Sequence, residues 1–131
     1  MDENDIIERF GLVPRAEGLP ENRALVHSLT MKENRDGNAL CVLLFAAGDP
    51  RDSLLIFKAK MSSFDAACYI DVQLVCGAGI EYTKDFLLNS QDHDARKLLE
   101  DLAACISAGD FAGFTPASHL ESYREYYGLD P

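Results

Sequence analysis

Apolar and polar positions alternate along much of the chain, and the alternation is longest in residues 68–76, CYIDVQLVC. Every second residue from Cys68 to Cys76 falls on one face of an extended chain, and the residues between them fall on the other. A period of two is typical of a half-buried β-strand. We therefore expect a strand here, and we expect the rest of the chain to cover its apolar face.

Three earlier segments also predict strands. Residues 24–32 alternate, with His27 on the apolar face, and residues 53–61 alternate again. Residues 39–47 are apolar without alternation, as in a central strand that is buried on both faces. The four segments together indicate one sheet.

Turn-forming residues separate these segments. Asp36-Gly37, within residues 33–38, is a hairpin signal, and residues 48–52 form a second turn. Residues 77–79 end the strand at 68–76. Residues 80–88 predict a fifth strand, although the same residues are also compatible with a helix.

Helical patterns lie at the two ends of the chain. Residues 4–10 predict a short helix. Residues 91–108 repeat apolar side chains at helical spacing and are followed by Gly109, which suits a helix end. A last helix is expected over residues 116–127, with Thr115 as its cap and proline in its first position.

The strands precede the two long helices, an order that favours the α+β class over the α/β class. We predict an antiparallel sheet of four to five strands in a meander, with a short N-terminal helix and two C-terminal helices packed on one face. A length of 131 residues predicts a single α+β domain over residues 1–131.

Negative charge dominates the surface chemistry, because 12 basic and 22 acidic side chains leave a formal net charge of −10. Nucleic acids and anionic membranes attract clustered Lys and Arg, so we expect neither as a partner. The charge favours a basic protein partner, and solubility alone is the alternative explanation. Residues 66–131 contribute 11 of the acidic side chains and four of the basic ones.

The spacing of the cysteines and the composition of the first ten residues predict a protein of a reducing compartment. No cysteine pair has the C-x-x-C spacing, and MDENDIIERF has no apolar signal-peptide core. We expect a cytoplasmic protein with buried, unpaired thiols. The four residues concerned are Cys41, Cys68, Cys76 and Cys105.

Two short motifs resemble ligand sites only in composition. Asp92, His93 and Asp94 are metal-ligand types, but consecutive helical residues point about 100° apart. We therefore expect them not to converge on one ion and interpret them as first-turn residues of a helix. Residues 77–79 follow a predicted strand but lack the lysine of a phosphate loop, which favours a turn. We expect no metal and no cofactor.

His27 is the basis of an alternative hypothesis. Cys41 on a neighbouring strand is the one nucleophile–base pairing that the predicted topology allows. In this alternative the chain is a small enzyme or ligand-binding α+β domain, with a pocket near His27 between the sheet and the helices. A hydrogen-bonded core histidine is the simpler interpretation.

The last helix has the composition of a binding surface. We expect Tyr123 and Tyr127 to pack against the core and Tyr126 to be exposed. Tyrosine offers a large contact area at low entropic cost, and adjacent acids suit a basic partner. The predicted protein-binding residues are Tyr126, Glu121, Glu125, Asp92 and Asp94.

These observations predict a non-catalytic, acidic protein-binding module that masks a basic surface on a toxin, effector or enzyme. Its size and charge are similar to those of immunity proteins, inhibitors and secretion chaperones, although no motif assigns it to one of these classes. A structural subunit that forms a homodimer is a third hypothesis.

Overall fold

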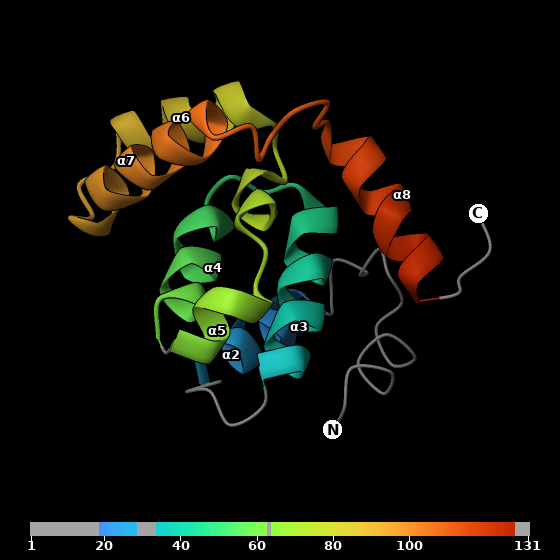
Figure 1. The fold of residues 1–131 in the computed structure, drawn as a ribbon. Coiled ribbons are helices and arrows are strands. Elements are labelled where there is room, and N and C mark those ends of the chain that lie inside the picture. Colours follow the sequence, from blue (N-terminus) through green and yellow to red (C-terminus); the bar gives the residue numbers. More distant parts are fainter. Residues whose placement is uncertain (1–18, 29–33, 63, 128–131) are drawn as a thin grey trace.

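The computed structural model describes residues 19–28, 34–62 and 64–127, and all regular elements among these residues are helices, with no β-strand. The predicted α+β fold, with its meander of four to five strands, is therefore wrong for the described part of the chain (Figure 1). The elements are α2 (Leu19–Ser28), α3 (Asn34–Ala47), α4 (Asp52–Lys60), α5 (Phe64–Tyr69), the 3-10 helix η2 (Val72–Cys76), α6 (Ile80–Leu88), α7 (Asp94–Ser107) and α8 (Pro116–Tyr126).

Helix α3 lies at the centre of the molecule (Figure 1). Each of residues 39–45 is at most 2% exposed, because α2, α4, α5, η2 and α8 all contact this helix. A helix enclosed on every side needs no polar face, and its sequence becomes a continuous apolar run. The predicted burial of residues 39–47 is thus confirmed over most of its length. The predicted strand is wrong, since a short apolar run fits either element.

The segment CYIDVQLVC does not form the predicted strand. Helix α5 ends at Tyr69, and residues 72–76 wind into η2. Cys68 is exposed, whereas Ile70 and Leu74, four positions apart, are at most 2% exposed. Two short helical turns bury Ile70, Leu74 and Cys76 from the face that alternation predicted, and they also bury Val75 from the opposite face. The pattern of residues 68–76 therefore did not distinguish a strand from short helical turns.

The other predicted strands are helices as well. Residues 24–28 lie in α2, residues 53–60 lie in α4, and residues 80–88 form α6, as the alternative interpretation of that segment allowed. Asp36-Gly37 is not a hairpin turn but belongs to the first part of α3. Helix α6 buries Thr83 and Leu87 and exposes Asp85, so its apolar and polar positions can resemble alternation. Helix α4 buries most of its residues and leaves Lys58 exposed among them, with a similar effect.

The predicted turns at residues 48–52 and 77–79 are confirmed. Two other predictions concern residues that the structure does not describe. The chain turns after α3 and after η2, where Gly48 and Gly79 have φ of 73° and 93°. The predicted helix at residues 4–10 and the end of the first predicted strand, residues 29–32, lie outside the described residues.

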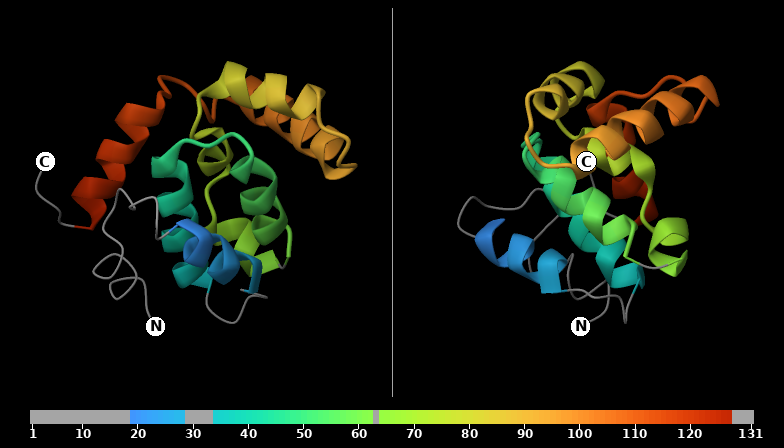
Figure 2. Two further views of the ribbon diagram at one scale, coloured as in Figure 1. Left: turned by 180° about the vertical axis from the view of Figure 1, so that it is seen from behind. Right: turned by 90° about the vertical axis from the view of Figure 1, so that its left-hand side faces the viewer.

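Both predicted C-terminal helices are confirmed, but they do not share one face of a sheet. Helix α7 buries Ala95, Leu98 and Leu102 and packs against α4 and α6, while α8 packs against α3 (Figures 1 and 2). Thr115 and Ser118 form a reciprocal capping box at the start of α8, with the Ser118 amide 3.0 Å from the Thr115 hydroxyl oxygen.

A bidentate ion pair holds α2 against α4. The Nε and Nη2 atoms of Arg23 donate to the two carboxylate oxygens of Asp52, at 2.8 and 3.0 Å. The Asp52 side chain is only 7% exposed, so this carboxylate depends on the guanidinium for its hydrogen bonds. The pair fixes how the first described helix lies on the bundle.

Candidate functional site

A cleft of about 420 Å³ opens between α4, the segment that joins α5 to η2, and α7. Its apolar lining includes the buried core residues Phe57, Ile70 and Leu98. Ligand pockets in proteins typically combine such an apolar lining with a few polar groups. The charged residues that line this cleft are Lys60, Asp71, Asp101 and Asp110.

Lys60 is the basic residue among the described residues that line the cleft, and its ammonium group is hydrogen-bonded to the backbone. Its ammonium group donates to the carbonyl oxygens of Ala67 and Ile70, at the end of α5. A cation satisfies and stabilises the unpaired carbonyls of a helix C-terminus. Burial lowers the pKa of Lys60, and the carboxylate of Asp71 opposes that effect. Three carboxylates outnumber this one ammonium group among the described lining residues, so the cleft carries a net negative charge.

The tyrosine ring of Tyr123 anchors α8 to the edge of the cleft. Its hydroxyl group donates to Oδ2 of Asp71, just before η2, and the side chain is 8% exposed. Burial, followed by this hydrogen bond to a carboxylate, raises the pKa of Tyr123 and keeps the phenol neutral. The packing predicted for Tyr123 is therefore confirmed, and the residue also positions Asp71.

Replacing Tyr123 by phenylalanine is expected to lower the free energy of unfolding by about 1–2 kcal/mol at neutral pH, because Asp71 loses its donor. The pKa of Tyr123 is higher in the folded state, so its contribution to stability is complete below about pH 10 and is lost at higher pH. Urea unfolding of both proteins at neutral and alkaline pH measures this. The variant should lose less stability above about pH 10 than the parent. Tyr126→Phe, at a 70% exposed position, is the matched control and should change little. A loss at neutral pH as small as that of the control would contradict the assignment.

Helix α8 presents an exposed stripe that combines acids with an aromatic ring. Its residues recur at helical spacing and are all exposed, and Tyr126 is 70% exposed as predicted. The structure therefore brings three of the five predicted binding residues together on the exposed side of one helix. The stripe consists of Ser118, Glu121, Ser122, Glu125 and Tyr126.

This stripe is continuous with the cleft. A hollow of about 230 Å³ lies beside α8 and is lined by Ser118, His119 and Ser122, among others. Gln73 and Asp110 line both the hollow and the cleft. The Gln73 amide nitrogen donates to the Asp110 carbonyl oxygen at 2.8 Å and so fixes the boundary between them. The stripe, the hollow and the cleft therefore adjoin one another from α8 to α7.

The remaining predicted binding residues, Asp92 and Asp94, lie elsewhere. They flank the start of α7, which is on the opposite side of the molecule from α8 in Figure 1. Lys58 of α4 lies between them, with its ammonium nitrogen 2.7 Å from Oδ2 of Asp92 and 3.8 Å from Oδ2 of Asp94. The hydrogen bond from Lys58 is the main cause of the lowered pKa of Asp92.

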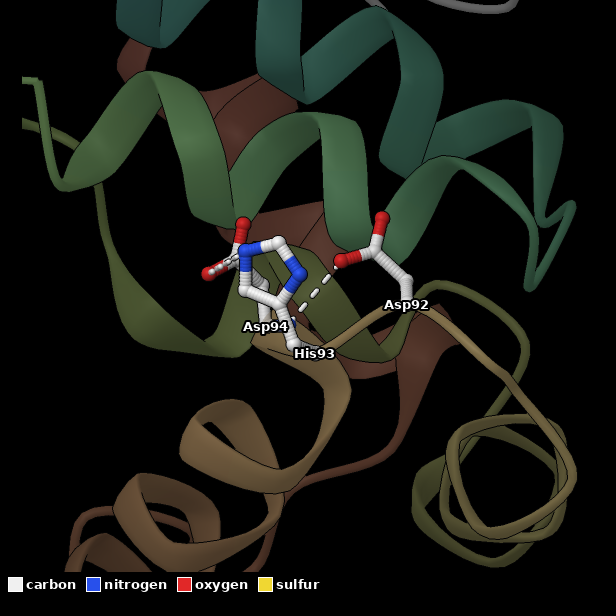
Figure 3. Close-up of side chains that lie close together, drawn as sticks. All are labelled: Asp92, His93 and Asp94. Carbon is white, nitrogen blue, oxygen red and sulfur yellow. Dashed lines mark hydrogen bonds and ion pairs between the residues drawn. The ribbon is translucent and has the colours of Figure 1, made fainter.

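The expectation that Asp92, His93 and Asp94 do not converge is wrong. One ligand atom from each lies within 4.8 Å of the others. Figure 3 shows the three side chains close together at the start of α7. Helical geometry does not apply to all three, because α7 begins only at Asp94. The Asp94 amide donates to Oδ1 of Asp92 at 2.9 Å, so this carboxylate already stabilises the helix start. Together with Lys58, these contacts give the cluster a structural role.

The two buried cysteines, Cys41 and Cys76, are poorly suited to act as nucleophiles. Burial raises the pKa of Cys41 to about 12 and that of Cys76 to about 11, which opposes formation of a nucleophilic thiolate. The expectation that all four cysteines are buried is confirmed for Cys41 and Cys76 and wrong for Cys68, which is exposed at the cleft; Cys105 is only half-buried. His27 belongs to α2, but its side chain lies outside the described residues, and the sheet of the alternative hypothesis is absent from the described part.

Sequence reasoning missed the acids of the cleft. Asp71 precedes η2, Asp101 lies in α7 and Asp110 follows that helix, so the three share no motif. Only the packing of η2 and α7 against α4 places them around one opening. Their position is therefore a property of the fold and not of any local pattern.

Comparison of the chain with protein-family models, curated proteins and solved structures found no match. Among the described residues, no helix combines the length and the apolar character that crossing a bilayer requires. The function is therefore argued from the charge, exposure and geometry of the chain's own residues.

Proposed function

We propose that the chain is an acidic protein-binding module of the cytoplasm, which masks a basic surface on a protein partner without catalysing a reaction. The observation that carries this proposal is the continuous surface from the α8 stripe, through the hollow, to the acidic cleft. A net charge of −10 would speed encounter with a basic partner and make the association sensitive to salt.

The composition of the surface supports this function. Tyrosine is enriched among the residues that dominate binding energy at interfaces, and nearby carboxylates steer and orient a basic partner. Tyr126 lies on the exposed side of α8, as do Glu121 and Glu125. Asp92 and Asp94 would contribute at long range only, because Lys58 partly neutralises them.

The immobilised chain should retain a basic protein from host extract at low ionic strength. The purified partner should bind at least about tenfold more weakly in about 500 mM NaCl than in about 50 mM NaCl, because salt screens exposed charges. A partner whose affinity does not change with salt would contradict the proposal, as would the absence of any retained protein.

Paired variants locate the contact surface. Glu121→Gln with Glu125→Gln should lower the association rate by about threefold to tenfold, because charges near the interface steer encounter. Glu81→Gln with Asp85→Asn makes the same charge change on the exposed side of α6 and is the matched control. Equal effects of the two pairs would show that only net charge matters and would exclude the α8 stripe.

A further inference from the structure

The acidic cleft has a property that general attraction to a basic surface does not require, namely an apolar interior. Cys68 and Ala104 are exposed and Val72 is half-buried where they line the opening between α4 and α7. Phe57, Ile70 and Leu98, at most 4% exposed, close the cleft from beneath. Met61, which is 51% exposed, stands among the residues that line the opening. A flat charged surface would bind ammonium groups equally well, so the apolar interior points to an apolar group on the ligand.

The charges around the cleft favour a ligand that carries positive charge. Three carboxylates line it, and the ammonium group of Lys60 already donates to two backbone carbonyls. Asp101 pairs with Lys97 at 3.0 Å, but both side chains are partly exposed, so the carboxylate can still attract a ligand cation. An anionic ligand would meet net repulsion, whereas a cationic one would be attracted.

The connection to α8 indicates the shape of the ligand. The cleft and the hollow meet at Gln73 and Asp110, so one ligand can lie along both. A small molecule would fill the cleft alone, while an extended peptide would also reach the α8 stripe. The length of this surface therefore favours a peptide segment over an isolated small amine.

We propose that the cleft between α4, η2 and α7 receives a large apolar side chain, aromatic in the best case, from an extended segment of the partner that carries Lys or Arg on both sides of it. This inference rests on the proposed function and adds the recognition element. The apolar side chain would enter the cleft, and the flanking cations would lie near Asp71, Asp101 and Asp110. Such a buried anchor with a charged rim is the usual arrangement of an interface hot spot.

Fluorescently labelled KKFKK and KKAKK peptides test the anchor, because they differ only in the central side chain. At low ionic strength KKFKK should bind the full chain at least about tenfold more tightly than KKAKK, which is the value expected for burial of one aromatic side chain. EEFEE should not bind. Phenethylamine, which carries one aromatic ring and one cation, tests whether a small amine suffices, and it should compete only at far higher concentration than KKFKK.

Two neighbouring alanines of α7 provide a matched pair of variants. Ala103 and Ala104 are both exposed, but only Ala104 lines the cleft. Ala104→Phe should fill the opening and reduce KKFKK binding about tenfold, to the level of KKAKK, and Ala103→Phe should change it less than about twofold. Circular dichroism and urea unfolding of both variants check that each retains the parent fold.

The possible outcomes separate this inference from the proposed function. If KKFKK and KKAKK bind equally and both are released by salt, the acidic surface attracts cations but the cleft is not used, and this inference is wrong while the proposed function stands. Equal effects of Ala103→Phe and Ala104→Phe would also overturn it. If phenethylamine competes as well as KKFKK, the cleft takes small amines instead of a peptide side chain. If neither peptide binds, both proposals fail.

Discussion

Replacement of Leu43 by alanine is expected to lower the free energy of unfolding by about 4 kcal/mol. Leu43 is 0% exposed and lies in the centre of α3, which five other elements contact. The loss combines the transfer free energy of the removed methyl groups with the cavity that a close-packed surrounding cannot fill. For a protein of ordinary stability, this is a large fraction of the total.

Leu88→Ala is the matched control for this experiment. Leu88 ends α6 and is 71% exposed, so the same chemical change should alter the free energy of unfolding by less than about 0.5 kcal/mol. Urea unfolding followed by far-UV circular dichroism measures both variants. A loss at Leu43 as small as the loss at Leu88 would contradict the central position of α3.

Gly77→Ala is expected to cost about 3 kcal/mol, because there is no room for a methyl group at this position. A Cβ atom at Gly77 would lie 2.5 Å from the carbonyl oxygen of Phe45 and 3.0 Å from its Cα atom. Both atoms belong to the backbone of α3, so the clash cannot be relieved by rotating a side chain. Gly77 thus allows η2 to approach the central helix.

Gly109→Ala is a control that separates the effect of a steric clash from the effect of an unfavourable backbone conformation. Gly109 has φ of 90° with open space around it, so alanine there meets only the backbone penalty of about 1–2 kcal/mol. Thermal and urea unfolding of the two variants should show the greater loss for Gly77→Ala. If Gly109→Ala were the more destabilising of the two, the close approach of η2 to α3 would be incorrect.

The proposed function and the inferred recognition of an apolar anchor depend on different parts of one surface. The α8 stripe supplies an exposed ring and two carboxylates, and the cleft supplies a buried apolar lining with acids around it. Tyr123 links the two through its hydrogen bond to Asp71. A partner that uses both would combine salt-sensitive encounter with slow dissociation from the apolar anchor.

Local signals predicted the helices at the C-terminal end of the chain well. Helix α7 carries an uninterrupted apolar stripe with Gly109 after it, and α8 begins with Thr115 and proline. Both patterns depend on residues three or four positions apart, so they are complete within the segment itself. The exposure of Tyr126 followed from the same helical spacing.

Local signals failed for the short helices around α3. In α3 the apolar run has no period, because neighbours enclose the helix on every side. In residues 68–76 the end of α5 and the turn of η2 together bury Ile70 and Leu74, and that spacing is shared by a strand face. With two or three turns per element, a period of 2 and a period of 3.6 select many of the same positions.

The amino-acid sequence by itself determined the net charge, the burial of residues 39–45, the two long C-terminal helices and the exposed aromatic-acidic character of α8, because each depends on composition or on neighbours within a few residues. The tertiary structure alone decided that the apolar run is a helix and that Asp71, Asp101 and Asp110 surround one apolar cleft. Which element an apolar segment forms depends on the partners that cover it. Acids from different elements meet only where packing brings those elements together.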